Sequence, residues 1–137
     1  MKRELTIKNE DQELMRVSEF IEGVGEELGL DTRTMMKLQL VMEEMVTNVI
    51  FYAYPRETSA SITLTAESDG QELTFILSDN GKPFDPTAKE DADTETNPMD
   101  REQGGMGILI VKNIMNEVSY QRLGDENRLT MKKTLDK

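Results

Sequence analysis

Cysteine and histidine are both absent from this chain of 137 residues. Without cysteine the chain can form no disulfide bond and no thiolate metal site. Without histidine it has no imidazole to act as a general base, to complete a serine–histidine triad or to ligate a metal, so acid–base chemistry must use carboxylates, lysines or tyrosines. These absences exclude histidine-dependent hydrolases and metal sites built on cysteine or histidine.

Positive charge is also scarce, because 16 Lys and Arg residues face 27 Asp and Glu residues and the net charge is −11. That balance argues against direct nucleic-acid binding and against docking on an anionic membrane. No apolar run approaches the roughly 20 residues needed to cross a bilayer, and the first residues alternate rather than forming an apolar signal region. We expect a cytoplasmic protein with one domain, residues 1–137, long enough to bury a core.

Hydrophobic periodicity predicts the elements. A weak strand is expected around 5–7, helices over 11–28, 31–54 and 107–118, and strands over 61–66, 73–77, 118–122 and 128–132. Four methionines at helical spacings, Met35, Met36, Met42 and Met45, are expected to fill the core. The order β-α-α-β-β-loop-α-β-β predicts an α/β two-layer sandwich, with a mixed, mostly antiparallel sheet and helices on one face.

The second helical pattern carries Glu44 and Asn48, which share a helix face because they are four residues apart. A carboxylate there can polarise a hydroxyl or water, and an amide oxygen beside it can complete the oxygen shell of Mg²⁺. The pair alone also fits a solvated face of an acidic protein. Glu43 is the rival base, rotated by about 100° around the helix.

Two further motifs lie at element ends. Asp79-Asn80-Gly81 follows an apolar strand, where the acid can accept a hydrogen bond from an exocyclic amine and the glycine can let the backbone approach a flat ring. Gly104-Gly105-Met106-Gly107 opens a helical pattern, where free amides can bind phosphate oxygens. Taken alone, the Asp79-Asn80-Gly81 motif also fits a plain turn, and the glycine cluster also fits a flexible hinge. Walker A and Rossmann glycine motifs are both absent.

Taken in order, these three segments resemble the N, G1 and G2 boxes of the GHKL, or Bergerat-fold, ATPases. The chain looks most like the compact anti-sigma-factor serine/threonine kinases (the RsbW-like branch) within that superfamily. The closer likeness extends to Ala53-Tyr54-Pro55, to Lys82-Pro83-Phe84-Asp85-Pro86 and to Ile114-Met115-Asn116-Glu117-Val118. Tyr52 stands where many relatives have a histidine, and Pro83 where a second glycine is frequent.

The resemblance implies ATP and Mg²⁺ as cofactors and a role for each motif. Glu44 would be the general base, and Asn48 would hold Mg²⁺. Asp79 would bind the adenine amine, with Gly81 shaping the pocket and Thr130 supporting the base. The phosphates would lie on Gly104, Gly105, Met106 and Gly107, and residues 86–103 would form a lid over ATP.

The resemblance also implies partners: a STAS-type anti-anti-sigma protein as the phosphorylated substrate, an RNA polymerase sigma factor to be sequestered, and a second copy of the chain in a homodimer. Two alternatives stay open. One is a regulatory module that binds nucleotide and a partner without phosphotransfer. The other is a sensor-kinase catalytic domain, which the absence of a phosphoacceptor histidine disfavours.

Overall fold

The computed structural model describes residues 1–53, 59–88 and 106–135. The elements follow the predicted order: β1 (Lys2–Lys8), a 3₁₀ turn (Asp11–Glu13), α1 (Leu14–Leu28), α2 (Thr32–Tyr52), β2 (Ser61–Ser68), β3 (Glu72–Asp79), a 3₁₀ turn (Pro86–Ala88), α4 (Met106–Ile114), β4 (Glu117–Leu123) and β5 (Glu126–Thr134). The last helix is shorter than its pattern indicated, because β4 begins at Glu117.

The strands form one sheet in the order β1-β2-β3-β5-β4, and every neighbouring pair is antiparallel. Apolar side chains lie in register across it, in the row Leu5, Leu64, Leu77, Leu129 and Tyr120. Since side chains alternate between the faces of a strand, this row and its neighbours two residues away face one side. The sheet therefore has one apolar face.

Local signals explain how the first two helices meet. Gly29 ends α1 with a φ of 67°, the left-handed conformation that glycine adopts without strain. Two residues later the side chain of Asp31 accepts a hydrogen bond of 2.7 Å from the amide of Thr34 and caps α2. The helix end expected at residue 28 is confirmed, and residue 31, the expected start of the second helix, is the cap before its first residue Thr32.

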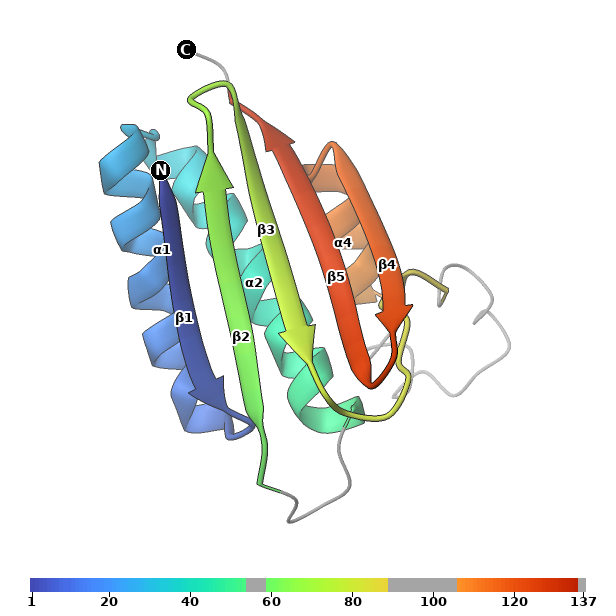
Figure 1. Cartoon of the computed structure of the whole chain (residues 1–137). Helices are drawn as coiled ribbons and strands as arrows, with labels where there is room; N and C mark the ends of the chain where they lie inside the picture. Colours follow the sequence, from blue (N-terminus) through green and yellow to red (C-terminus); the bar gives the residue numbers. More distant parts are fainter. Residues whose placement is uncertain (54–58, 89–105, 136–137) are drawn as a thin grey trace.

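Helices α1, α2 and α4 cover the apolar face of the sheet, with α2 between the other two (Figure 1). The core fills the space between these layers, and Phe75, Leu38 and Met45 are among its fully buried side chains. The opposite face of the sheet carries hydroxyl and charged side chains, among them Thr65 and Lys132. The predicted two-layer α/β sandwich is confirmed, and its sheet is antiparallel throughout the described strands.

The methionines of α2 divide between the core and the surface. Met42 and Met45 are fully buried, and Met35 lies over Gly25 of α1. Met36 is 62% exposed, so the prediction that it fills the core is wrong. It lies on the outer side of α2, because the helix turns by about 100° between neighbouring residues.

In the described residues no helix is long and apolar enough to cross a membrane.

Candidate functional site

The middle of α2 holds the first part of the site. Asn48 is buried, with 4% of its surface exposed, and Glu44 lies one turn earlier and is half-buried. Both side chains sit at the margin of the core stripe, because the neighbouring Met45 and Val49 are buried against the sheet. A carboxylate and an amide are thus held on one helix face where water has limited access.

The first turn of α4 lies against this pair. A Cβ added to Gly107 would be 2.8 Å from Oε2 of Glu44 and 3.7 Å from Nδ2 of Asn48. No side chain larger than hydrogen fits there without moving the carboxylate. The motifs that the sequence placed around residues 44–48 and at Gly107 are therefore neighbours in space, and the N-terminal end of α4 points its partial positive charge toward them.

The setting of Glu44 changes its acidity. Burial raises the pKa of its carboxyl above the ordinary value, and the negative charge of neighbouring Glu43 raises it further. Both effects disfavour the ionised form. Glu43 itself is exposed on the outer side of α2, so Glu44 is the carboxylate that faces Gly107.

Asp79 ends β3 on the face covered by the helices and is 4% exposed. Its Oδ2 accepts a hydrogen bond of 2.8 Å from the amide of Gly81 and one of 3.1 Å from Nδ2 of Asn127. Within the described residues, both hydrogen bonds to this carboxylate end on Oδ2. Oδ1 is then the oxygen that can accept a hydrogen bond from a ligand.

Gly81 has a packing role that its sequence did not indicate. A Cβ there would be 2.3 Å from the carbonyl oxygen of Ala53 and 2.9 Å from Oδ2 of Asp79. The next amide, that of Lys82, donates to the same Ala53 carbonyl at 2.9 Å. The turn after β3 is therefore fastened to the C-terminal end of α2. The close approach that requires glycine is to this carbonyl.

Asn127 is a site residue that the sequence analysis missed. It lies opposite Asp79 in the pairing of β3 with β5, is 4% exposed and contacts Asp79 directly. A signal was available, because Asn127, Leu129 and Met131 alternate along β5 and the asparagine is the polar member of an inward-facing set. A buried amide in such a set needs hydrogen-bond partners.

Thr130 does not have the position expected of it. Leu129 and Met131 point into the core, so Thr130 between them points to the opposite face of the sheet, where it pairs with Ile76 of β3. Asp79 faces the helices, so the sheet separates the two side chains. The expectation that Thr130 supports the base beside Asp79 is wrong, and Asn127 occupies the place assigned to it.

The glycine cluster is described in part. Gly104 and Gly105 lie outside the described residues, as do residues 89–103 of the expected lid. The backbone of Met106 begins α4, and Gly107 is buried beside Glu44. The site as described therefore consists of Glu44, Asn48, Asp79, Gly81, Gly107 and Asn127.

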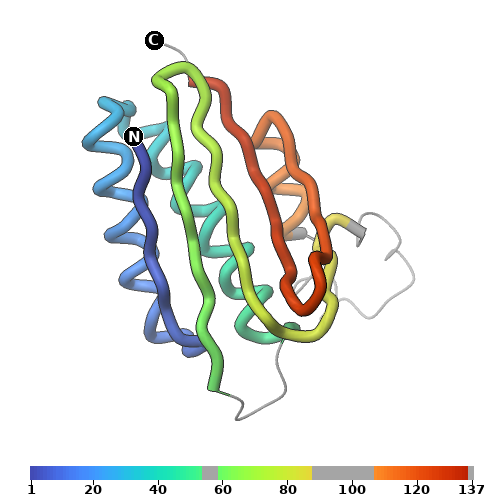
Figure 2. Tube along the Cα trace, in the orientation of Figure 1, coloured from blue at the N-terminus to red at the C-terminus, as the bar shows by residue number. Residues whose placement is uncertain are grey.

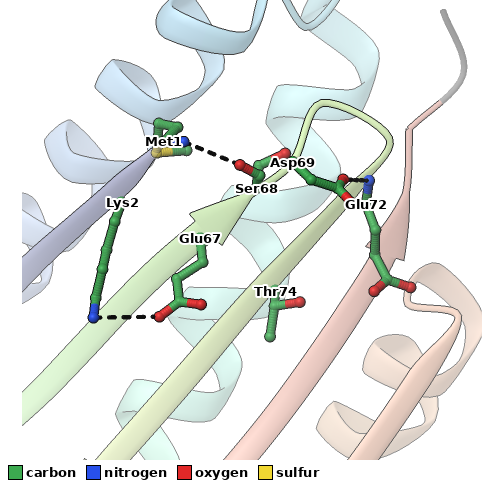
Figure 3. Close-up of a pocket in the computed structure, with 7 residues that line it drawn as sticks. All are labelled: Met1, Lys2, Glu67, Ser68, Asp69, Glu72 and Thr74. Carbon is green, nitrogen blue, oxygen red and sulfur yellow. Dashed lines mark hydrogen bonds and ion pairs between the residues drawn. The ribbon is translucent and has the colours of Figure 1, made fainter.

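A separate cavity lies at the other end of the sheet. It measures about 490 Å³ and is lined by Met1, Lys2, Glu67, Ser68, Asp69, Glu72 and Thr74 (Figure 3). None of these residues belongs to the site. Exposed charged groups line it, and an ion pair of 3.5 Å between Lys2 and Glu67 spans part of it. The candidate functional site lies at the C-terminal half of α2, away from this cavity.

The two halves of the site are joined by α2. Glu44 meets α4, and Ala53, nine residues further along, meets the turn after β3. Nine residues of helix span roughly 13 Å. A ligand that touches both ends must be elongated. It would meet a carboxylate acceptor at one end, and a helix N-terminus with an amide and a carboxylate at the other. Such donors and acceptors fit a nucleotide with a phosphate chain.

Comparisons with known proteins show the family to which the chain belongs. The sequence profile of the family described as the histidine kinase-like ATPase domain matches residues 7–133. The chain is similar to the serine/threonine-protein kinase BtrW of Bordetella bronchiseptica, with 29% identity over 99 residues that cover 72% of this chain and 70% of that protein. An anti-sigma F factor of Anoxybacillus flavithermus is 26% identical over 102 residues, covering 74% of this chain and 70% of the relative.

Two more relatives extend the comparison. The serine-protein kinase RsbW of Halalkalibacterium halodurans is 23% identical over 122 residues, covering 86% of this chain and 74% of the relative. A crystal structure of the RsbU and RsbW domains of a Mycobacterium tuberculosis protein superposes with a TM-score of 0.70 at 13% identity. That superposition covers 98% of this chain and 32% of the other, so the fold is shared with one part of a longer protein.

Proposed function

Because the chain belongs to the histidine kinase-like ATPase domain family, we propose that it is a Mg-ATP-dependent protein serine/threonine kinase and anti-sigma factor. The observation that carries the proposal is the contact of Gly107 with Glu44 and Asn48, together with the fastening of Gly81 to the far end of the same helix. The relatives include two protein kinases and an anti-sigma F factor, which supports the choice among the family's activities.

The residues present fit ATP at both ends. Oδ1 of Asp79 would accept the adenine amine, and the N-terminal turn of α4 at Gly107 would bind phosphate oxygens through its amides and its dipole. Asn48 would give its amide oxygen to Mg²⁺, whose other ligands would be phosphate oxygens and water. In the described part of the chain no group of three or more acidic side chains could hold a metal ion.

Glu44 would act as the general base when bound ATP supplies the phosphoryl group to be transferred. Its carboxylate would accept the proton of a substrate serine or threonine hydroxyl. Burial and Glu43 both raise its pKa, and a base whose pKa lies nearer the working pH takes a proton more effectively.

The partners follow from the family likeness. We assign a STAS-type anti-anti-sigma protein as the phosphorylated substrate and an RNA polymerase sigma factor as the sequestered partner. Residues 86–103 would serve as a lid whose last residues meet the phosphates. A homodimer is included in the proposal, with β1 at an edge of the sheet as the candidate contact.

Phosphotransfer to a STAS-domain protein tests the proposal. The purified chain is incubated with Mg-ATP and the candidate substrate, and phosphoprotein is measured by mass spectrometry. The matched controls are the substrate with its acceptor hydroxyl replaced by alanine and the Glu44→Gln variant of the kinase. Transfer that both controls abolish is the expected result. ATP binding and partner binding without any transfer would instead favour the regulatory module that does not turn over.

A further inference from the structure

The inner face of β4 carries two side chains, Tyr120 and Arg122, that converge on the amide of Asn127. We propose that Tyr120 and Arg122 are positioning residues that give the site its preference for a purine bearing an amine, because they hold the Asn127 amide in the one orientation that keeps Asp79 a pure acceptor. This inference rests on the proposed ATP site and deepens it.

The hydrogen bonds of Asn127 are complete on both of its atoms. Its Oδ1 accepts from the hydroxyl of Tyr120, from Nη1 of Arg122 at 3.1 Å and from the amide of Phe84 at 3.3 Å. Its Nδ2 donates to Oδ2 of Asp79 at 3.1 Å and to the carbonyl of Lys82 at 2.8 Å. Both hydrogens of the amide nitrogen are therefore used.

The opposite orientation of the amide is chemically unfavourable. It would turn Oδ1 toward the Asp79 carboxylate and the Lys82 carbonyl, which can only accept. It would turn the amide nitrogen toward Arg122, which has donors but no acceptor. The contacts of Asn127 with Arg122 and with Asp79 would then both be between like groups, in a buried setting where unmatched polar groups are costly. Arg122 therefore favours the observed orientation together with the Phe84 amide, the Asp79 carboxylate and the Lys82 carbonyl.

The selected orientation has a consequence for the ligand. With Nδ2 of Asn127 and the Gly81 amide both donating to Oδ2, Asp79 is held with Oδ1 as the remaining acceptor. An exocyclic amine can donate to that oxygen, whereas a carbonyl at the same place cannot. Selectivity between a purine with an amine and a purine with a carbonyl at that position would then depend on Tyr120 and Arg122, which never touch the base.

Arg122 also ties the surrounding backbone together. Its Nη1 donates to the carbonyl of Gly81 at 2.8 Å, and its Nε donates to the carbonyl of Gly124 at 3.0 Å. One guanidinium thus joins the tip of the β4–β5 hairpin to the turn after β3, which passes beneath that tip (Figure 2). Losing it would remove one of the three donors to Oδ1 of Asn127 and one hydrogen bond to the turn that carries Gly81.

The test compares ATP with inosine triphosphate, in which a carbonyl replaces the amine. Calorimetric affinities are measured for the wild-type chain, for Arg122→Ala and for Tyr120→Phe. The matched control is Arg128→Ala, which removes an arginine from β5 whose partly exposed side chain forms an ion pair with Glu126 on the opposite face of the sheet. Thermal unfolding of each variant is recorded alongside.

In the wild type we expect ATP to bind roughly 10- to 150-fold more tightly than inosine triphosphate, the scale of a hydrogen bond to a charged group. Arg122→Ala should reduce that ratio at least about fivefold, Tyr120→Phe should reduce it by less, and Arg128→Ala should leave it unchanged. If these side chains had a purely structural role, their loss would weaken the binding of both nucleotides alike. The ratio of the two affinities would then stay unchanged. Should Arg122→Ala fail to fold, Tyr120→Phe decides the question, because it removes only a hydroxyl.

Two negative results point to different errors. A wild-type chain that binds neither nucleotide overturns the proposed ATP site, and this inference with it. A wild type that prefers ATP, with folded variants that keep the same preference, overturns only the role assigned to Tyr120 and Arg122.

Discussion

Gly107 at the start of α4 lies so close to Glu44 that a Cβ on the glycine would be 2.8 Å from the carboxylate oxygen Oε2. Real Cβ atoms do not come this close to an oxygen, so any other residue at this position must displace the carboxylate. The crowded atom is the far end of a flexible side chain, which can move at little cost. Glycine is therefore needed at position 107 so that the Glu44 carboxylate can keep its position.

Gly107→Ala should separate activity from stability. Alanine favours a helix over glycine by up to about 1 kcal/mol, so the midpoint of thermal unfolding should stay level or rise. Phosphotransfer should fall, because the new methyl group moves the Glu44 carboxylate away from its place. Single-turnover rates and thermal melts of the same preparation measure the two effects.

The matched control is Gly23→Ala in α1, a second helical glycine whose added Cβ would meet only the tip of Arg3, at 3.1 Å. It should keep the wild-type transfer rate. Equal rates for Gly107→Ala and Gly23→Ala would show that the contact with Glu44 is not needed for transfer.

Glu44→Gln keeps the size of the side chain and removes its basicity. Nucleotide affinity should stay close to wild type, while the rate of phosphotransfer should drop by on the order of 10²–10⁴, the usual contribution of a positioned base. Glu43→Gln, on the exposed neighbour, should keep most of the rate. If instead Glu43→Gln were the inactive variant, the roles of the two carboxylates would be reversed.

The pH dependence of transfer should reflect the raised pKa of Glu44. The rate should fall as the pH drops through that pKa, because the protonated carboxyl cannot accept the substrate proton. Glu43→Gln removes the like charge and should move this acid limb to lower pH. An acid limb at the same pH in both proteins would mean that another group controls it.

The raised pKa of Glu44 also makes the stability of the fold depend on pH. A carboxyl whose pKa is higher in the folded state favours folding at low pH, and that contribution is lost as the pH rises through the folded-state pKa. Ionised Glu44 is therefore a cost to the fold near neutral pH. Urea unfolding should show Glu44→Gln to be at least as stable as wild type at pH 7, with the difference shrinking at acid pH.

Asp79→Asn should weaken ATP binding by roughly 1.5–3 kcal/mol, the scale for a hydrogen bond to a charged group. The asparagine oxygen can still accept from Gly81 and Asn127, which leaves its amide nitrogen facing the place of the adenine amine, donor against donor. Calorimetry with ATP measures the loss, and GTP gives the comparison. Equal ATP affinity in mutant and wild type would remove Asp79 from the site.

Gly81→Ala should destabilise the fold and the site together. Its Cβ would be 2.3 Å from a backbone oxygen, that of Ala53, which cannot move as a side chain can. Overpacking of this kind costs about 1–3 kcal/mol. The control is Gly70→Ala in the β2–β3 turn, where a φ of 96° strains alanine but no atom of the described residues lies within 4 Å of the added Cβ. Both should lower the free energy of unfolding, but only Gly81→Ala should also weaken ATP binding.

Much of the architecture could be predicted from local patterns. Helical periodicity, the stop at Gly29 and the cap at Asp31 depend on neighbours within a few residues, so the sequence alone placed α1 and α2 and put Glu44 on the same helix face as Asn48. The alternation of β2 and β3 likewise placed Asp79 at a strand end.

The pairing of distant strands could not be predicted in this way. Which residue of β5 lies opposite Asp79 depends on the register between strands, and a change of one residue turns every side chain to the other face of the sheet. The family resemblance predicts that Thr130 lies beside Asp79. The register instead puts Thr130 on the face of the sheet away from the helices and puts Asn127 beside Asp79. The fastening of Gly81 to Ala53, and of Arg122 to the turn after β3, also joins residues that are distant in sequence. Local pattern determined which residues could carry the chemistry, and the packing of α2, α4 and the sheet decided which of them meet, because contacts between distant segments depend on register and packing that no short stretch of sequence contains.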